Sequence, residues 1–295
     1  MLRGILPPLV TPFHPDGAID LASFEANVES YAAEDLAGYV VLGSNGEAAS
    51  LEEEEKLALL RAARRRAGGR LVIAGTGLES TRATIAFTAK AADTGADAAL
   101  VLTPSAFKSQ MTLDALRRHY EAIAEASPIS VMLYSFPAVT GLAFPPGLAA
   151  AVAGHPRVVG MKESSGDVGL LGRIVSSVPA SFSVACGSAP AVYASLCVGA
   201  SAGILAVANC APRPAAALYR AFAASDHPRA RRIQEALTPL AVAVTATHGV
   251  AGLKAATDLA GRRGGSVRSP LLPLAPAVRD ELKRLLDAAD SAARS

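Results

Sequence analysis

The chain has 295 residues, of which 51% are hydrophobic and 18% are charged, and its formal net charge is +2. This composition excludes a largely disordered protein, and the small net charge excludes the strongly basic surface on which nucleic-acid and anionic-membrane binding depend. A single α/β barrel with a large core fits this length.

The cysteines, the histidines and the N-terminus predict neither a metal nor a membrane partner. The three cysteines show no close pairing, which is typical of buried thiols in a reducing compartment, so we expect a cytoplasmic protein. The five histidines lack the spacing of metal ligands. The apolar stretch at residues 4–10 is interrupted by Pro7 and Pro8 and does not resemble a signal peptide, and no apolar run is long enough to cross a bilayer.

Eight short apolar runs recur along the first two thirds of the chain and predict buried strands. They cover residues 5–10, 39–42, 71–74, 98–102, 130–134, 158–162, 182–186 and 203–207. Helical patterns at residues 52–66, 81–94, 113–126, 145–153 and 168–177 lie between them. Ser50 and Glu53 form a predicted capping box for the first of these helices. Further helical patterns follow at residues 212–224, 227–245, 250–259 and 276–292.

Strands that alternate with crossover helices are typical of a parallel sheet. Eight such units predict an α/β fold, the (β/α)8 TIM barrel. The alternative is an open doubly wound sheet, which the absence of a Gly-x-Gly-x-x-Gly turn after the first strand disfavours. We expect residues 1–224 to form the barrel and residues 225–295 to form a C-terminal helical extension.

Lys162 ends the sixth apolar run, and chemistry in parallel α/β folds gathers where strands end. Strand alternation places Val158, Gly160 and Lys162 on one face, with Gly160 leaving room for the lysine stem. A free amine at this position can attack a ketone and form a Schiff base. The simpler alternative is a lysine that ends a strand and points to water.

Two further strand ends carry candidate groups. Tyr134 precedes Lys162 by 28 residues, one βα unit, so the two should end neighbouring strands at similar height, where a phenol can move protons. The turn Gly43-Ser44-Asn45-Gly46-Glu47 can direct backbone N–H groups at an anion such as a carboxylate. A packed tyrosine and an ordinary βα turn are the alternatives. Together with small residues at the later strand ends, these groups suit a 2-oxo acid substrate.

Three segments carry a family resemblance when they are considered together: Gly43-Ser-Asn-Gly-Glu47, Tyr134-Ser-Phe-Pro137 with Thr140-Gly141, and Gly160-Met-Lys-Glu-Ser164. They resemble the dihydrodipicolinate synthase and N-acetylneuraminate lyase family of class I pyruvate aldolases, and the similarity covers nearly the whole chain. The resemblance implies a TIM barrel with a C-terminal helical extension, assembled as a homotetramer or homodimer.

The same resemblance implies roles for particular residues. Lys162 would form the Schiff base with pyruvate, without a metal or another cofactor, and Tyr134 would act as the proton shuttle. Ser44 and Asn45 would bind the pyruvate carboxylate. The backbone at Gly187 and Ile204 would line the pocket.

Three departures from the family pattern affect the expected substrate. Val139 stands where dihydrodipicolinate synthases carry an arginine for the aldehyde's carboxylate. Those enzymes use a tyrosine pair after a Thr-Pro, and here the segment is Thr103-Pro104-Ser105-Ala106-Phe107-Lys108, so the relay tyrosine is missing near Ala106 and Phe107. Ser188-Ala189 stand where sialic-acid lyases place acidic residues. The pattern is most similar to 4-hydroxy-2-oxoglutarate aldolase and 2-keto-3-deoxy-sugar-acid aldolases.

The predicted function is therefore cleavage of a 4-hydroxy-2-oxo acid to pyruvate and an aldehyde, with Ser164 as a contact to the distal end of the substrate. Dihydrodipicolinate synthase, which condenses pyruvate with aspartate semialdehyde, is the first alternative. A sugar-acid dehydratase and a 2-oxo-acid binding protein without turnover are the others. The expected partner is a small 2-oxo acid, with no nucleic acid and no membrane.

Overall fold

The eight strands form one sheet in the order β1-β8-β7-β6-β5-β4-β3-β2 in the computed structural model, which describes residues 1–294. The strands are β1 (Gly4–Leu6), β2 (Gly38–Val41), β3 (Leu71–Gly75), β4 (Ala98–Leu102), β5 (Ser130–Ser135), β6 (Val158–Glu163), β7 (Ser183–Cys186) and β8 (Ala202–Ile204). The first and last strands of this order, β1 and β2, are also joined: the Ala37 N–H donates to the Ile5 carbonyl and the Val40 N–H donates to the Pro7 carbonyl, both at 3.0 Å. The predicted (β/α)8 TIM barrel is therefore confirmed, since an open doubly wound sheet has free edges and a reversal of strand order.

Helices connect and follow the strands. They are α1 (Leu21–Ser30), α2 (Glu53–Arg66), α3 (Thr81–Asp93), α4 (Leu113–Ala126), α5 (Pro137–Thr140), α6 (Leu148–Val152), α7 (Val168–Ser177), α8 (Val192–Cys197), α9 (Pro212–Ala223), α10 (His227–Val242), α11 (Gly249–Leu259) and α12 (Arg279–Arg294). Short polar side chains accept a backbone N–H at the start of several helices, namely Asp20, Ser80, Thr112, Asp167 and Asp226. Such caps satisfy donors that the first turn leaves without partners and so fix where each helix begins.

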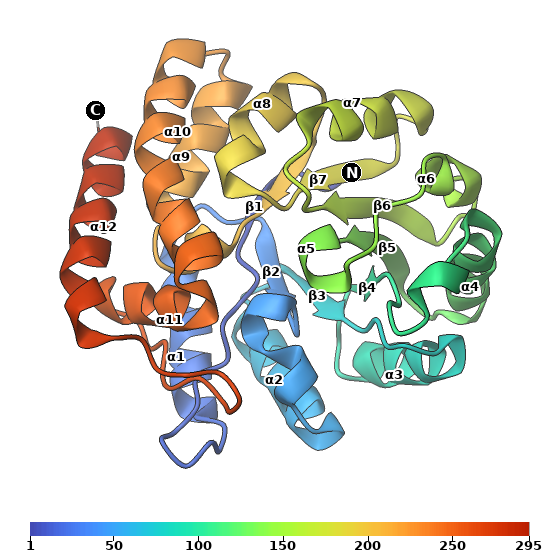
Figure 1. Ribbon diagram of the computed structural model, residues 1–295, viewed down its shortest axis with the longest axis horizontal. Coiled ribbons are helices and arrows are strands. Elements are labelled where there is room, and N and C mark those ends of the chain that lie inside the picture. The colour runs from blue at the N-terminus through green and yellow to red at the C-terminus, as the bar shows by residue number, and fades with distance from the viewer. Residues whose placement is uncertain (295) are drawn as a thin grey trace. The chain divides into compact units, whose positions relative to one another are not determined.

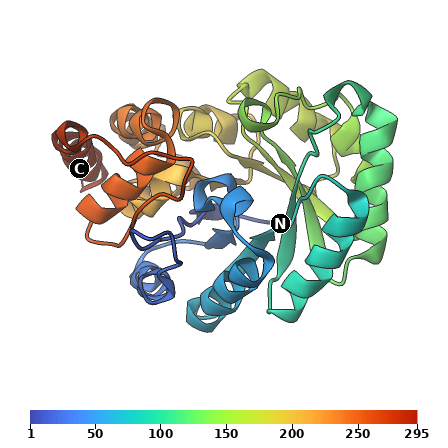
Figure 2. The ribbon, with the colours of Figure 1, turned by 60° about the horizontal axis from the view of Figure 1, so that its bottom comes forward.

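The chain divides into two compact units. The first unit combines Met1–Arg3 with Ile73–Gly203 and contains strands β4 to β7, which pair in parallel. Figure 2 shows its helices α3 and α4, in cyan and green, running alongside β4 and β5. Every residue of β4 except the last, Leu102, is buried, which is typical of a strand covered on both faces.

The second unit combines Gly4–Val72 with the chain from Ile204 onward, so it contains both ends of the barrel sequence and the C-terminal helices. Within it, α10 packs between α9 and α12 (Figure 1), and α11 packs against α12. The division predicted between residues 224 and 225 stays a prediction.

Several predicted boundaries are wrong for local reasons. The strand expected at 203–207 ends at Ile204 and is followed by a 3-10 helix, Ala206–Asn209. The strand expected at 5–10 ends at Leu6, because the two prolines that follow have no N–H to donate to a ladder. The capping box of α2 consists of Glu52 and Glu55 rather than Ser50 and Glu53, with the Glu52 N–H donating to Glu55 at 2.8 Å.

Three helices, α1, α5 and α8, have no counterpart in the sequence prediction. The helix expected at 227–245 loses its α-helical hydrogen bonding after Val242 and continues as a π-helical turn, Ala243–Thr247. None of the helices described in residues 1–294 is both long and apolar enough to cross a membrane.

Candidate active site

Two adjacent strands of the first unit end in a lysine and a tyrosine whose polar groups meet. Lys162 on β6 pairs with Tyr134 on β5 in parallel register. Lys162 Nζ donates to the Tyr134 hydroxyl at 3.3 Å and lies 4.3 Å from the centre of its ring. The two residues are only 3% and 4% exposed. The prediction that they end neighbouring strands at similar height is confirmed, and the alternative of a lysine pointing to water is wrong.

A glycine and a serine complete the surroundings of the lysine. A Cβ added at Gly187 would lie 1.9 Å from Ser164 Oγ and 2.9 Å from Lys162 Cε. The Gly187 backbone therefore touches both side chains, and no other residue type fits there without displacing them. The Ser164 hydroxyl is buried and has no hydrogen-bond partner among residues 1–294. An unsatisfied buried hydroxyl beside a candidate nucleophile is available to a substrate.

The predicted role of Gly160, to leave room for the Lys162 stem, is wrong. A Cβ at this position would lie 2.4 Å from the Ser183 carbonyl oxygen on β7. Gly160 thus allows β6 and β7 to approach each other, whereas Gly187 is the glycine that leaves room for the lysine stem.

The backbone of Tyr134 is held by Thr103, the residue that follows β4. Thr103 donates both its N–H and its hydroxyl to the Tyr134 carbonyl, each at 3.1 Å. The Tyr120 hydroxyl lies 3.3 Å from Thr103 Oγ1 and donates to the Val101 carbonyl. Burial raises the pKa of Tyr120 and keeps this hydroxyl protonated. Sequence reasoning missed Thr103, although its place immediately after a strand was a usable signal.

The loop after β4, which contains Ala106 and Phe107, is anchored by an acidic side chain. Glu79 accepts the backbone N–H groups of Ser105 and Ala106, both at 2.8 Å. Phe107 is 66% exposed. Lys108 extends from this loop to the turn after α5, where a Cβ at Gly141 would lie 2.6 Å from Lys108 Nζ. The loop thus offers a cation instead of a phenol.

Glu163 follows the lysine but faces the other side of β6. It is 1% exposed and accepts the Ser165 N–H at 2.9 Å. Burial raises the pKa of its carboxyl group. Its contacts fix the turn that carries Ser164, because the carbonyl of Glu163 also accepts the Gly187 N–H at 2.6 Å.

In the second unit, the turn after β2 is bracketed by two residues in the left-handed region. Leu42 has φ of 64° and Glu47 has φ of 54°, although neither is glycine. Such backbone strain costs about 1–3 kcal/mol per residue and is concentrated at functional sites. Between them, Ser44 and Asn45 are half-buried. Among residues 1–294 they have no acceptor for their amide N–H groups and no partner for their side chains, so these groups are free to bind a ligand.

The carboxylate of Glu47 is held by the C-terminal part of the chain. Lys254 on α11 forms an ion pair with Glu47, and both side chains are almost completely buried. The backbone N–H of Arg268 donates to Glu47 Oε2 at 2.9 Å. Burial lowers the pKa of Lys254, and the ion pair with Glu47 opposes that effect. Sequence reasoning noted both segments but missed this contact, because nothing local in either one indicates it.

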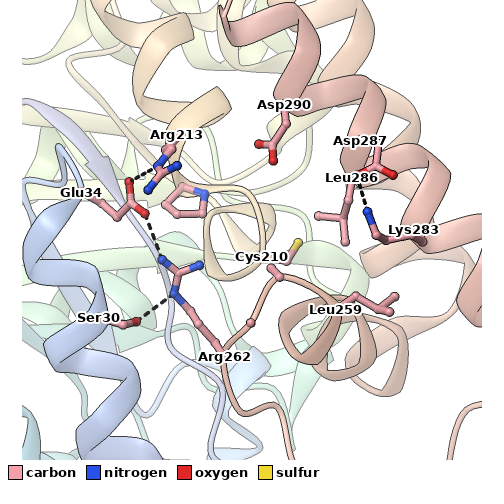
Figure 3. Close-up of a pocket in the computed structure, with 13 residues that line it drawn as sticks. Ser30, Glu34, Cys210, Arg213, Leu259, Arg262, Lys283, Leu286, Asp287 and Asp290 are labelled. Carbon is pink, nitrogen blue, oxygen red and sulfur yellow. Dashed lines mark hydrogen bonds and ion pairs between the residues drawn. The ribbon is translucent and has the colours of Figure 1, made fainter.

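A separate cavity of about 350 Å³ lies within the second unit (Figure 3). Six of the thirteen residues that line it are charged, among them Glu34, Arg213 and Arg262, with Lys283 and Asp287 from α12. None of the predicted site residues lines it. Figure 3 shows Glu34 between the two arginines, joined to both by ion pairs.

The structure thus brings four predicted residues together in the first unit: Lys162, Tyr134, Ser164 and Gly187. Ser44 and Asn45 are in the second unit, as is Ile204, the fully buried last residue of β8. A buried amine bonded to a phenol supports Schiff-base formation with a carbonyl substrate. The described residues 1–294 contain no cluster of three or more His, Cys, Asp or Glu side chains able to hold a metal ion.

The comparisons with known proteins agree with this chemistry. The model of the dihydrodipicolinate synthetase family matches residues 1–289. The 4-hydroxy-tetrahydrodipicolinate synthase of Exiguobacterium sibiricum is 37% identical over 273 residues, 92% of each chain. That of Methanoculleus marisnigri is 34% identical over 290 residues, 97% of this chain and 99% of the relative.

The fold comparison gives the same family. The structure of dihydrodipicolinate synthase from Acinetobacter baumannii complexed with pyruvate has a TM-score of 0.92 and 31% identity, and the match covers 98% of this chain and 99% of that one. Proteins of this family are class I pyruvate-dependent lyases that form a Schiff base between a lysine and pyruvate, and the match spans nearly every residue. This chain therefore belongs to the dihydrodipicolinate synthetase family.

Proposed function

We propose that this protein condenses pyruvate with aspartate semialdehyde, the reaction of 4-hydroxy-tetrahydrodipicolinate synthase. The hydrogen bond between Lys162 and Tyr134 is the observation that supports the pyruvate half of the reaction. The names of the relatives, which are 32–37% identical, support the aldehyde half and favour synthesis over the aldol cleavage that the sequence first suggested.

In the proposed mechanism, Lys162 Nζ attacks the C2 carbonyl of pyruvate, and Tyr134 passes a proton to the hydroxyl group that leaves as water. The resulting iminium loses a proton from C3 to give an enamine, the enamine carbon attacks the aldehyde carbon, and the alkoxide that forms takes up a proton. The amino group of the semialdehyde then attacks the iminium carbon, which closes the ring and releases Lys162 as a free amine. Ser44 and Asn45 bind the pyruvate carboxylate, and the free Ser164 hydroxyl contacts the distal end of the bound substrate. The backbone at Gly187 and Ile204 lines the pocket.

The aldehyde substrate carries a second carboxylate, and Val139 cannot bind it, since a valine side chain offers no donor. Lys108 offers a cation nearby, because its ammonium group lies beside Gly141, the second residue after Val139. Among residues 1–294, this ammonium group has no ion-pair partner. We propose that Lys108 takes the place of the missing arginine.

Replacing Lys108 by methionine tests this role. The variant should raise KM for aspartate semialdehyde by about tenfold, the effect of losing about 1.4 kcal/mol of binding, and leave KM for pyruvate unchanged. Steady-state kinetics with each substrate varied in turn measures both constants. Lysine 90, on α3, provides a control, and Lys90→Met should change neither value. An unchanged KM for the semialdehyde in Lys108→Met would contradict the assignment.

The pyruvate half of the proposal is tested by reduction with borohydride in the presence of pyruvate, followed by peptide mass mapping. A pyruvate adduct on Lys162 is expected. An adduct elsewhere, or none, would overturn the proposed mechanism.

Cleavage of a 4-hydroxy-2-oxo acid is the second candidate, and Val139, which is 55% exposed, is the observation that favours it. Assays of both reactions on one preparation separate the two. Faster turnover of 4-hydroxy-2-oxoglutarate than of pyruvate with aspartate semialdehyde would replace the proposal by this candidate. Water loss from a sugar acid would indicate a dehydratase. An adduct without turnover of any of these substrates would indicate a binding protein.

We also infer that the protein assembles as a homotetramer, as the family resemblance implies. Light scattering during size-exclusion chromatography should give four times the 30.0 kDa chain mass. A mass equal to that of one chain would contradict this assembly.

A further inference from the structure

The turn that contains Ser44 and Asn45 is tied to the C-terminal part of the chain by the side chain of Glu47. One carboxylate oxygen of Glu47 accepts the Arg268 N–H at 2.9 Å, and the other is paired with the Lys254 ammonium. Both partners follow β8 by about fifty residues or more and belong to the helical extension of the barrel.

Several contacts besides the ion pair fix the position of Lys254. Its ammonium group donates to the Ser266 carbonyl at 2.6 Å and lies 4.4 Å from the centre of the Phe13 ring. Gly264 packs against its backbone, where a Cβ would lie 2.1 Å from the Lys254 carbonyl oxygen. The lysine is 1% exposed, so its charge is directed at Glu47 rather than at water.

Glu47 needs such an anchor because its backbone is in the left-handed region, which a residue with a Cβ adopts at a cost. The conformation ends the short helix Ser44–Gly46, in which the Glu47 N–H donates to the Ser44 carbonyl at 3.1 Å. On the other side of the turn, the Thr11 hydroxyl holds the Gly46 carbonyl at 2.8 Å. A strained turn persists only when its surroundings fix it.

From this arrangement we infer that Lys254 is a positioning residue for pyruvate: through Glu47 it holds the turn in the conformation in which Ser44 and Asn45 bind the carboxylate. The inference rests on the proposed function, since it needs pyruvate at this turn. It assigns to the C-terminal extension a role in substrate affinity and not only in stability.

The test is a titration of the borohydride reaction with pyruvate in the wild-type protein and in the double variant Lys254→Met/Glu47→Gln. Removing Lys254 alone leaves a buried carboxylate without a counter-charge and can prevent folding. The double variant removes both charges and keeps an acceptor for the Arg268 N–H. Circular dichroism confirms that each variant is folded.

The double variant should raise the pyruvate concentration for half-maximal labelling of Lys162 by about tenfold, because a small displacement of a positioning group is costly. Labelling at saturating pyruvate and KM for the aldehyde should stay at the wild-type values. The matched control is Lys283→Met, which removes an exposed lysine paired with Asp287 on α12, and it should leave the titration unchanged.

The outcomes separate the inference from the proposed function. If the wild-type protein is not labelled at Lys162, the proposed function fails, and the inference fails with it. If the wild-type protein is labelled and the folded double variant has the same half-maximal concentration, the inference alone fails. An equal rise in KM for both substrates would indicate a general loosening of the barrel and would also overturn it.

Discussion

Lys162 is held by contacts on several sides before any substrate arrives. The Tyr134 hydroxyl bonds its nitrogen, and the Gly187 backbone lies against its stem. Preorganisation of this kind is worth more than the individual contacts, because the reacting nitrogen does not need to be reoriented during the reaction.

Gly187→Ala should therefore reduce the rate of pyruvate labelling by about 100-fold, the effect expected from moving a reacting group by about 1 Å. The new methyl group would overlap with Ser164 Oγ and press on Lys162 Cε. Gly154→Ala is the control, because a Cβ there meets nothing within 4 Å. Labelling kinetics with borohydride measures the effect, and equal rates for the two variants would show that the lysine stem has room to move.

At this scale the sequence predicts the positions of the lysine and the tyrosine well and the residues that support the site poorly. Lys162 and Tyr134 can be found from strand ends alone, because alternation and the length of one βα unit determine where they lie. Lys254 cannot be found in this way. It follows Glu47 by 207 residues, and a lysine in a helical pattern is usually at the surface. Its role depends on tertiary packing that no local pattern encodes.

Among the elements, α2 begins with a side chain, that of Glu55, which takes part in both a capping box and an ion pair. Glu55 accepts the Glu52 N–H in the capping box and binds the Arg268 guanidinium through both oxygens at 2.7 Å. The hydrogen bond to Arg268 is the main cause that lowers the pKa of Glu55 from its usual 4.5. The start of α2 is thus joined to the loop after α11.

This lowered pKa predicts a pH dependence of stability. Glu55 stabilises the folded state fully above its unfolded-state pKa of about 4.5, and the stabilisation is lost as the pH falls through the lower folded-state value. At pH 7 the free energy of unfolding of the wild-type protein should exceed that of Glu55→Gln by about 1 kcal/mol, and this difference should disappear in acid. Urea unfolding of both proteins from pH 7 to about pH 3 measures this. A difference that persists at the acid end would contradict the assignment.

The charged cluster in Figure 3 joins α1 to the C-terminal helices. Glu34, 8% exposed, pairs with Arg262 at 3.1 Å and Arg213 at 3.2 Å. The Arg262 side chain is 11% exposed and lies over the Tyr31 ring, whereas that of Arg213 is 77% exposed. The buried Arg262 should therefore stabilise the fold far more than the exposed Arg213.

Arg262→Ala should therefore lower the free energy of unfolding by about 3 kcal/mol, because it removes the main counter-charge of a buried carboxylate. Arg213→Ala should lower it by less than about 1 kcal/mol. Urea unfolding measures both, and the two variants serve as controls for each other, since both truncate an arginine paired with Glu34. Equal losses would mean that burial does not decide the strength of these pairs.

The sequence also predicts most elements, and its errors have physical causes. The limits of β4, α4 and α7 are correct: a continuous apolar run defines β4, and apolar patterning coincides with a polar cap at α4 and α7. The end of β8 is wrong because residues 203–207 are equally apolar in a strand and in a buried 3-10 turn, so hydrophobicity cannot distinguish them. Similarly, the apolar residues of α1 show little helical periodicity, so the sequence does not indicate this helix.

For the whole molecule, the important feature is that the second unit is built from both ends of the chain. Glu34 and Glu47 are in its N-terminal part, and their main basic partners, Arg262 and Lys254, are in its C-terminal part. The barrel predicted at 1–224 therefore lacks Lys254, which pairs with Glu47, and Arg262, the more buried of the two partners of Glu34.

A fragment of residues 1–224 should fail to show a cooperative thermal transition. Each buried carboxylate that loses its buried counter-charge costs about 3–5 kcal/mol, and together these losses approach the usual total stability of about 5–15 kcal/mol. Calorimetry and near-ultraviolet circular dichroism test the fragment, with the full-length chain as the reference. Adding Glu34→Gln and Glu47→Gln to the fragment should partly restore folding. A cooperative transition in the unmodified fragment would show that the barrel is independent of its extension.

The ion pair between Glu47 and Lys254 also has a consequence for how the protein is made. A ribosome adds about 5–20 residues per second, so Lys254 emerges about 10–40 s after Glu47. During that interval Glu47 has no counter-charge, and the turn it anchors has no fixed conformation. The turn that Glu47 anchors thus gains this counter-charge only after the 207 residues that separate Glu47 from Lys254 have been added.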